Sequence, residues 1–168
     1  MYLSGRAKDL IIRGGHNIDP AVVEDALLAH PQVAAAAAVG RPDPHSGEVP
    51  VAYVALVAGA SVGVDELRAW AAERVAEPAA APKTVRVLDA IPVTPIGKPY
   101  KLPLRADATR RAVLDALAAI SPRAGVETRI EDGHPVTTVH LPSDADLAAV
   151  EAVLGRYAVT WELAVGQR

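Results

Sequence analysis

The sequence predicts an α+β fold: a mixed sheet with a short hairpin and flanking helices, followed by a small α-β-β-α-β sandwich. The chain has 168 residues, 51% of them hydrophobic, which suffices for one ordinary domain or two small ones. It has no cysteine, so any core forms without disulfides. Apolar β-branched runs alternate with segments of helical spacing, and this pattern restarts after Arg105. We therefore expect a boundary near 105 to 108, with units at residues 1–105 and 106–168.

The first expected elements are a hairpin and a helix. Arg13-Gly14-Gly15-His16 suits the hairpin turn, because paired glycines take the positive φ angles of a tight reversal. Asp19 is expected to cap the helix that begins at Pro20, where a missing N–H costs nothing. The helix is expected to end at His30-Pro31. The flanking strands are expected at Asp9–Ile12 and Asn17–Ile18.

Two longer strands, a second helix and a third strand are expected next. Val33–Val39 and Val51–Val57 predict antiparallel strands, joined by a wide loop of turn residues over 40–50. Val64–Glu77 has helical spacing and stops before a proline. Thr84–Leu88 predicts a short strand, which leads into the loop PVTPIGKPYK.

The second unit repeats this alternation in a smaller form. Asp107–Ile120 predicts an amphipathic helix, and Asp132-Gly133 is a strong hairpin signal between two alternating strands. Ser143 is expected to cap a helix that runs to Tyr157. The strands are expected at Val126–Glu131, Pro135–Leu141 and Ala158–Val165, with the helices on one face of the sheet.

Charge and hydropathy exclude several classes of function. The formal net charge is −3, so the chain lacks the basic excess needed for binding nucleic acid. No apolar run approaches the length of a membrane span, and the first residues lack the apolar core of a signal peptide, so we expect a cytoplasmic protein. The histidines are scattered without ligand spacing, and loop polarity accounts for His45 and Glu48, so no metal site is expected.

Lys98 is the first candidate functional residue. It follows Gly97, whose backbone can approach a ligand closely, and Pro95 and Pro99 restrict the flanking dihedral angles. Such a loop presents one compact positive charge, which suits a phosphate or a developing carboxylate–phosphate transition state. The alternative interpretation is a solvated lysine in an ordinary turn.

Several separated motifs, in order, resemble the C-terminal domain of the adenylate-forming (AMP-binding) enzymes, and most closely acyl-CoA synthetases. The resemblance covers about residues 2 to 105, and its GGHNIDP segment is closer to acyl-CoA synthetases than to adenylation domains of peptide synthetases. The motifs are Gly5-Arg6-x-Lys8-Asp9, Gly14-Gly15-x-Asn17-Ile18-x-Pro20, Val23-Glu24, His30-Pro31-x-Val33, Gly40-x-Pro42-Asp43, Gly47-Glu48 and Pro92-x-Thr94-x-x-Gly97-Lys98.

The resemblance implies a two-step ligase with domain alternation. A carboxylic acid attacks ATP to give an acyl-adenylate and pyrophosphate; the C-terminal domain then turns, and CoA attacks the adenylate. The matched positions imply that Lys98 bridges the carboxylate and the α-phosphate during adenylation. Lys8 matches the hinge, and Arg6 matches an arginine near the ribose of the nucleotide. The turn Arg13, Gly14, Gly15 and His16 would line the CoA tunnel after the rotation.

Other interpretations of these residues stay open, and two segments depart from the family pattern. Arg6 and Asp9 could pair or cap the hairpin, and Gly14 and Gly15 would be needed for the turn with or without CoA. The family usually has an aliphatic and then often a basic residue after the lysine, whereas this chain has Pro99-Tyr100-Lys101. Ala80-Ala81 stands where many relatives have an aromatic–lysine pair, which puts a phosphate contact there in doubt.

The resemblance also implies what lies outside this chain. ATP, Mg²⁺ and the carboxylic acid would be bound mainly by the family's N-terminal domain, acting in cis or in trans, so we expect the isolated chain to be inactive and Met1 to be an internal start. The acyl pocket would lie in that domain, and a fatty acid is a guess at the level of the family. The alternative function is a stand-alone, non-catalytic binding module. A weaker third hypothesis makes 108–166 a ligand-sensing domain.

Overall fold

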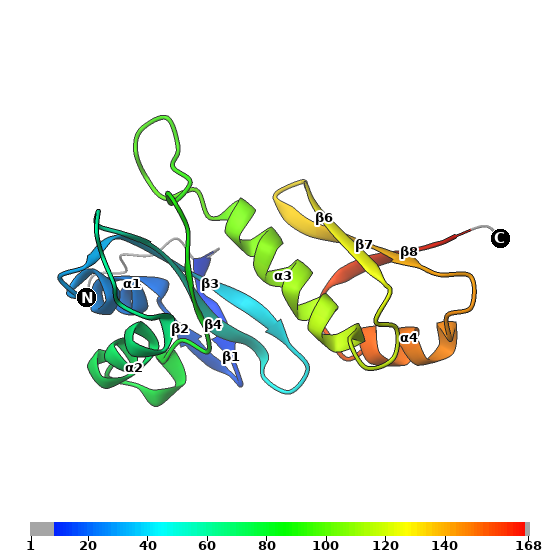
Figure 1. Ribbon diagram of the computed structural model, residues 1–168. Coiled ribbons are helices and arrows are strands. Elements are labelled where there is room, and N and C mark those ends of the chain that lie inside the picture. Colours follow the sequence, from blue (N-terminus) through cyan, green and yellow to red (C-terminus); the bar gives the residue numbers. More distant parts are fainter. Residues whose placement is uncertain (1–8, 167–168) are drawn as a thin grey trace.

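The first unit is built on a mixed five-stranded sheet. The computed structural model describes residues 9–166. Its strand order is β2-β1-β4-β3, with β5 added parallel to β4 and the other pairs antiparallel (Figure 1). The strands are β1 (Ile11–Arg13), β2 (His16–Ile18), β3 (Val33–Asp43), β4 (Gly47–Leu56) and β5 (Val85–Val87).

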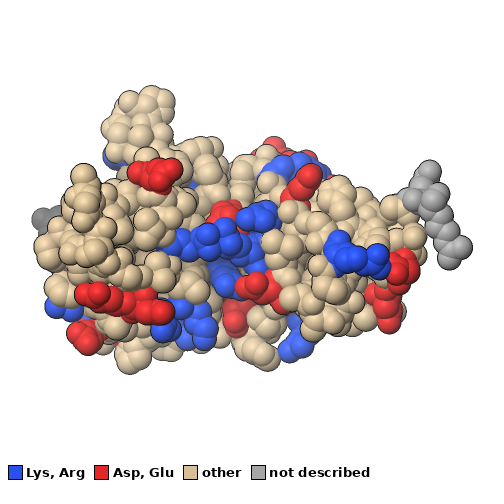
Figure 2. Space-filling view, in the orientation of Figure 1, with Lys and Arg blue, Asp and Glu red and all other residues tan. Residues whose placement is uncertain are grey.

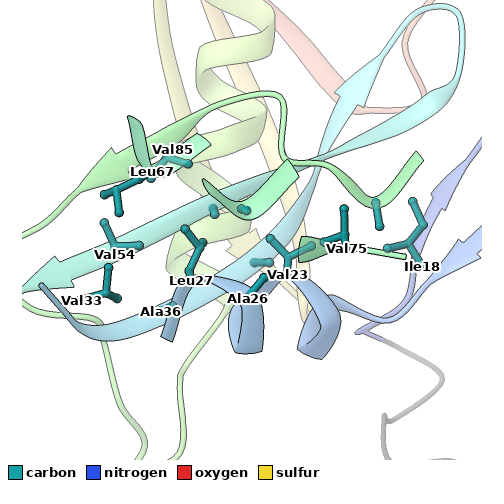
Figure 3. Close-up of a cluster of buried hydrophobic side chains, with 14 of the residues drawn as sticks. Ile18, Val23, Ala26, Leu27, Val33, Ala36, Val54, Leu67, Val75 and Val85 are labelled. Atoms are coloured by element: carbon teal, nitrogen blue, oxygen red, sulfur yellow. The ribbon is translucent and has the colours of Figure 1, made fainter. Parts of the chain in front are cut away.

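Helices cover both faces of this sheet. They are α1 (Pro20–Leu28), α2 (Val64–Arg74) and α3 (Leu102–Leu117), with a short 3₁₀ turn, η2 (Pro78–Ala80), before β5. Successive strand residues point to opposite faces, so β3 and β4 supply two separate cores. Figure 3 shows the core under α1 and α2, which includes Val23, Leu27 and Val54. On the other face, Leu104 and Ala108 of α3 pack on Tyr53 and its neighbours.

The hairpin and the start of α1 form as the sequence predicts. β1 and β2 pair in register around Gly14-Gly15, and Asp19 Oδ1 accepts a hydrogen bond from the Ala21 N–H at 2.9 Å. Pro20 is the first residue of α1.

The wide loop expected over 40–50 is wrong. β3 and β4 continue to pair as far as Asp43 and Gly47, so only a tight turn joins them. The Asp43 carboxylate closes this turn by accepting hydrogen bonds from the N–H groups of His45 and Ser46, at 3.0 and 2.8 Å. Proline in this segment suggested a loop, but Pro42 lies on β3, an edge strand, where a missing N–H is tolerated.

The second unit is a three-stranded sheet with helices on one face. Asp132 and Gly133 both have positive φ in the tight turn between β6 and β7, and β8 adds parallel to β7. Residues of α3 and α4 pack with β6 and β7 in one core that includes Val113, Val139 and Leu154. The elements are β6 (Gly125–Glu131), β7 (His134–Leu141), α4 (Leu147–Leu154) and β8 (Thr160–Val165). The predicted α+β class and the order of elements are confirmed.

Five expected helix limits are wrong by three residues or more. α3 ends at Leu117 rather than Ile120, and α4 ends at Leu154 rather than Tyr157. α2 ends at Arg74 rather than Glu77, because the chain turns into η2. Asp146 rather than Ser143 caps α4, and its Oδ1 accepts from the Ala149 N–H at 3.1 Å. α3 begins at Leu102 rather than Asp107, because the Leu104 side chain is needed in the core of the first sheet.

α3 is one continuous helix that lies against both units (Figure 1). Leu104 and Ala108 belong to the core of the first sheet, whereas Val113 and Leu117 belong to that of the second. The expected boundary at 105 to 108 thus falls within α3, and it stays a prediction.

Two features are absent from the described part of the chain. No helix within 9–166 has the length and apolar character needed to cross a bilayer. Nor do three or more His, Asp or Glu side chains of these residues gather as potential metal ligands.

Candidate functional site

The segment Pro92–Lys101, which we call the lysine loop, folds back on itself as a small hairpin. The Gly97 N–H donates to the Thr94 carbonyl at 2.8 Å, and the Thr94 N–H donates to the Lys98 carbonyl at 2.7 Å. Gly97 has φ +78°, in the left-handed region that favours glycine. A further bond from the Tyr100 N–H to the Pro92 carbonyl, at 2.7 Å, closes the base. The backbone is therefore fixed although the loop projects from the fold.

Lys98 lies at the exposed end of this hairpin. Its N–H lies 3.2 Å from Thr94 Oγ1, so Thr94 fixes the backbone at the lysine from two sides. Among residues 9–166, no ion pair involves the Lys98 ammonium group. Ile96, two residues before it, is 79% exposed. The loop thus presents one cation beside an exposed apolar side chain.

A partly buried ion pair anchors the end of the lysine loop. Lys101 Nζ lies 2.6 Å from Glu24 Oε1, and both side chains are less than one-fifth exposed. The same Glu24 oxygen accepts a hydrogen bond from the Ala38 N–H at 2.8 Å. Glu24 therefore joins α1, β3 and the last residue of the loop. The neighbouring Asp25 is exposed.

The segment Arg13–His16, which we call the glycine turn, connects β1 to β2. Gly14 and Gly15 have φ +54° and +85°, so the turn requires both positive angles. The Gly14 N–H donates to the Ser46 carbonyl at 2.8 Å, which holds the turn against the β3–β4 turn. A Cβ built on either glycine meets no atom within 4 Å, so the surface of the turn is open.

Long-range contacts position the strand that leads into the glycine turn. Arg13 Nη1 donates to the Ala79 carbonyl in η2 at 2.8 Å. The Ile12 N–H donates to Glu48 Oε2 at 3.0 Å. The Glu48 carboxylate also fills the space beside Gly40, where a Cβ would lie only 2.5 Å from the Glu48 carboxyl carbon. Loop polarity was expected to explain Glu48, but its carboxylate braces β1 against β4.

The lysine loop and the glycine turn lie at opposite ends of the sheet. The glycine turn bonds beside the β3–β4 turn, where β4 begins. β5 runs parallel to β4, and the chain continues from the far end of β5 into the lysine loop. Figure 1 shows this loop projecting at the top of the view. One small domain therefore presents two different loops at two ends.

Two candidate residues, Arg6 and Lys8, lie outside the described residues. Of the neighbouring positions, Asp9 Oδ1 lies 3.7 Å from Arg105 Nη2 at the start of α3. The structure therefore gives Asp9 a partner that the sequence analysis did not consider.

A hydrogen-bonded group fixes the start of α3, directly after the lysine loop. Tyr53 Oη donates to Asp107 Oδ2 at 2.9 Å, and Arg111 Nε donates to the same oxygen at 2.9 Å. Burial would raise the pKa of Asp107, but hydrogen bonds from Arg111 and Tyr53 outweigh it and leave this pKa below its usual value. Burial and the bond to Asp107 raise the pKa of Tyr53. Nothing in the local sequence pattern marked these residues, because the contacts join a strand to a distant helix.

Comparison with known proteins agrees with the resemblance seen in the motifs. The family model described as the AMP-binding enzyme C-terminal domain matches residues 22–98. The marinolic acid–CoA ligase of Pseudoalteromonas sp. (strain SANK 73390) is 49% identical over 120 residues, which is 71% of this chain and 18% of that protein. The medium/long-chain-fatty-acid–CoA ligase FadD8 of Mycobacterium tuberculosis is 40% identical over 62% of this chain and 19% of its own. The chain thus spans about a fifth of these curated relatives.

Solved structures of longer chains contain a part with a similar fold. Apo MatB from Rhodopseudomonas palustris aligns with a TM-score of 0.60 and 30% identity, over 64% of this chain and 21% of that one. The amide bond synthetase McbA from Marinactinospora thermotolerans aligns with a TM-score of 0.57 and 40% identity, over 63% of this chain and 21% of that one.

Proposed function

We propose that this chain is the mobile part of an ATP-dependent acid–CoA ligase, because residues 22–98 match the model of the AMP-binding enzyme C-terminal domain and the marinolic acid–CoA ligase is 49% identical over 71% of the chain. In the first step, a carboxylate oxygen attacks the α-phosphorus of ATP, and pyrophosphate leaves. In the second, the CoA thiol attacks the acyl carbon, AMP leaves and the thiol proton is released. The chain matches only about a fifth of its relatives, so the partner is an N-terminal domain, in cis or in trans.

In this proposal Lys98 serves the first step. Its ammonium group would contact the attacking carboxylate and the α-phosphate. The positive charge would offset the repulsion between these two anionic groups as they approach. The fixed hairpin backbone supports this role, because a loop already ordered loses little conformational entropy when it enters a site. The exposed Ile96 would pack on the larger domain when the loop enters.

The glycine turn serves the second step. The open surface around Gly14 and Gly15 would leave room for the narrow pantetheine chain of CoA, flanked by Arg13 and His16. Arg6, near the ribose, and Lys8, as the hinge, keep the roles that the motifs predict for them. The rest of the proposal follows the family. Mg²⁺ and ATP would be bound mainly by the N-terminal domain, and the substrate would be a small-molecule carboxylic acid such as a fatty acid. The protein would be cytoplasmic.

The observation that carries the proposal is the position of the two loops at opposite ends of one sheet. Since the lysine loop and the glycine turn cannot both enter the same active site in one orientation of the domain, each step would require its own orientation. A binding module would need no such arrangement of two separate loops.

The direct test is a chimera in which this chain replaces the matching C-terminal part of the marinolic acid–CoA ligase. Pyrophosphate release with ATP, Mg²⁺ and the acid used by that ligase is measured for the chain alone and for the chimera. We expect no release from the isolated chain, and release followed by CoA thioester formation from the chimera. Release by the chain alone, or a folded chimera that stays inactive beside an active parent enzyme, would contradict the proposal.

A further inference from the structure

An arginine-lined groove lies between β5, the end of β3 and the middle of α3. Its volume is about 360 Å³, in the lower part of the range of about 300–1,000 Å³ that is usual for small-molecule sites. Figure 2 shows Lys and Arg side chains gathered near the centre of this face, between the two units. No residue of the lysine loop or the glycine turn lines the groove. The lining residues are Arg41, Thr84, Val85, Arg86, Arg111, Leu114 and Asp115.

The guanidinium groups here are held in place but only partly engaged. Arg41 Nη2 lies 2.6 Å from Asp115 Oδ2, and Arg111 Nε lies 2.9 Å from Asp107 Oδ2. Each recorded bond uses one nitrogen, and a guanidinium carries five N–H donors. The three arginine side chains are between 22% and 41% exposed, so they are fixed within the groove rather than extended into solvent.

Arg86 is the least satisfied of these groups. Its Nε is buried, and no hydrogen-bond acceptor for it exists among the described residues. The carboxylate oxygen with which Arg86 forms an ion pair, Asp107 Oδ2, is 4.0 Å away and already accepts from Tyr53 and Arg111. A buried charged donor without an acceptor is costly unless a ligand satisfies the side chain.

The local charge is also unusual for this chain. Three of the lining residues are arginines (41, 86 and 111) and one is an aspartate (115), which gives the lining a formal charge of +2 in a protein of net charge −3. Because acidic residues predominate elsewhere, this concentration of arginine is a local feature of the groove. Partly desolvated arginines bind oxyanions through pairs of parallel N–H bonds, a geometry that lysine cannot offer.

We infer that this groove binds a phosphorylated small molecule, with Arg86 and Arg111 as the main contacts to its phosphate oxygens. A pyrophosphoryl group, free or within a nucleotide, suits both the charge and a volume larger than one phosphate fills. Asp115 competes for Arg41 and therefore weakens the site. This inference stands on the groove alone and does not depend on the ligase function.

The test is calorimetric titration of the 168-residue chain with pyrophosphate, ADP and inorganic phosphate at low ionic strength. We expect pyrophosphate to bind more tightly than phosphate, and Arg86→Ala to weaken binding by about ten-fold, which corresponds to the loss of one charge-assisted contact. ADP binding more tightly than pyrophosphate would identify a nucleotide as the ligand; equal binding would identify the pyrophosphoryl group itself.

Asp115→Asn and Asp144→Asn provide a matched pair of variants. Both remove one exposed carboxylate that lies 2.6 Å from an arginine, but only Asp115 lines the groove. We expect Asp115→Asn to tighten pyrophosphate binding several-fold and Asp144→Asn to leave it unchanged. A tightening cannot arise from loss of folding, so this variant tests the site even if Arg86→Ala is unstable. Equal effects of the two variants would overturn the inference and indicate non-specific binding to positive charge. No pyrophosphate binding at all would also overturn it and would favour an acidic protein partner.

Discussion

Gly14 and Gly15 differ from ordinary turn residues because the space around them is empty while their φ angles are positive. A Cβ at Gly15 would meet no neighbouring atom, so the cost of a side chain in the free domain is the backbone strain of the positive φ. Asparagine tolerates the left-handed region better than other residues with a side chain. An asparagine here would therefore obstruct a bound chain without preventing the turn.

We predict that Gly15→Asn in the chimera slows thioester formation by roughly ten- to a hundred-fold, because it displaces the reacting CoA. The rate of adenylation should stay within about two-fold of the parent, since the lysine loop is at the other end of the sheet. Gly133→Asn, at φ +77° in the β6–β7 turn, is the matched control and should affect neither step. Loss of both steps together in Gly15→Asn would show that the glycine serves only the fold.

Asp107 makes folding stability depend on pH. Its pKa is lowered in the folded state, since hydrogen bonds from Arg111 and Tyr53 outweigh the opposing effect of burial. Its contribution is therefore fully present above the unfolded-state pKa of about 3.9, and it is lost as the pH falls through the folded value. We predict that Asp107→Asn lowers the free energy of unfolding by about 1–3 kcal/mol at pH 7 and that this difference shrinks below pH 4.

Urea unfolding at pH 7, 5, 4 and 3 measures this difference. Asp115→Asn, which removes an exposed carboxylate from the same helix, should change the free energy of unfolding by less than about 1 kcal/mol throughout. A difference for Asp107→Asn that does not vary with pH would mean that its hydrogen bonds, and not its charge, account for the effect.

Individual residues with a local signature could be found from the sequence. Asp19 and the paired glycines were predicted because caps and positive-φ turns depend on the nearest residues. The bonds of Glu24 to Lys101 and of Tyr53 to Asp107 were not predicted. Each joins residues far apart in the chain, and only the packed fold brings them together.

The ion pair between Glu24 and Lys101 joins two elements, α1 and the end of the lysine loop. Since both side chains are largely shielded from water, their interaction should exceed that of a surface pair. We predict a coupling energy of about 1–3 kcal/mol in a double-mutant cycle of Glu24→Gln and Lys101→Met, measured by urea unfolding.

Arg123 and Asp144 form the matched control pair, with the same 2.6 Å separation but both side chains about two-thirds or more exposed. Their coupling energy should stay below about 1 kcal/mol. Similar values for the two pairs would show that the loop is held by its backbone hydrogen bonds alone.

At the scale of elements, the sequence predicted which segments form helices and strands better than where they end. The 40–50 segment contains several turn residues, yet pairing across the sheet extends both strands through most of it. α3 begins before the expected boundary because Leu104 fills the first core. Both errors arise from tertiary contacts that override local preference.

The whole molecule is linked by α3, whose first half packs in one core and whose second half packs in the other. Unfolding either unit would therefore expose part of the helix that supports the other unit.

Trp70 lies in α2 of the first unit and Trp161 in β8 of the second, so each tryptophan reports on one unit. We predict that Trp70→Phe and Trp161→Phe variants give coincident urea midpoints by fluorescence and by circular dichroism. Two separated transitions would instead support a division of the chain near 105 to 108.

If the first unit rotates between the two steps, the second unit moves with it, because α3 is unbroken between them. In the proposed rotation, one end of the domain would serve adenylation and the other would serve CoA. A single lysine substitution should therefore affect the two half-reactions differently.

The most direct measurement compares the two half-reactions of the chimera carrying Lys98→Ala. Pyrophosphate release measures adenylation, and thioester formation from preformed acyl-adenylate measures the CoA step. We predict that adenylation slows by about two to three orders of magnitude, roughly 2.7–4 kcal/mol of lost charge stabilisation, while the CoA step is nearly unchanged. Equal losses in both steps would contradict the account.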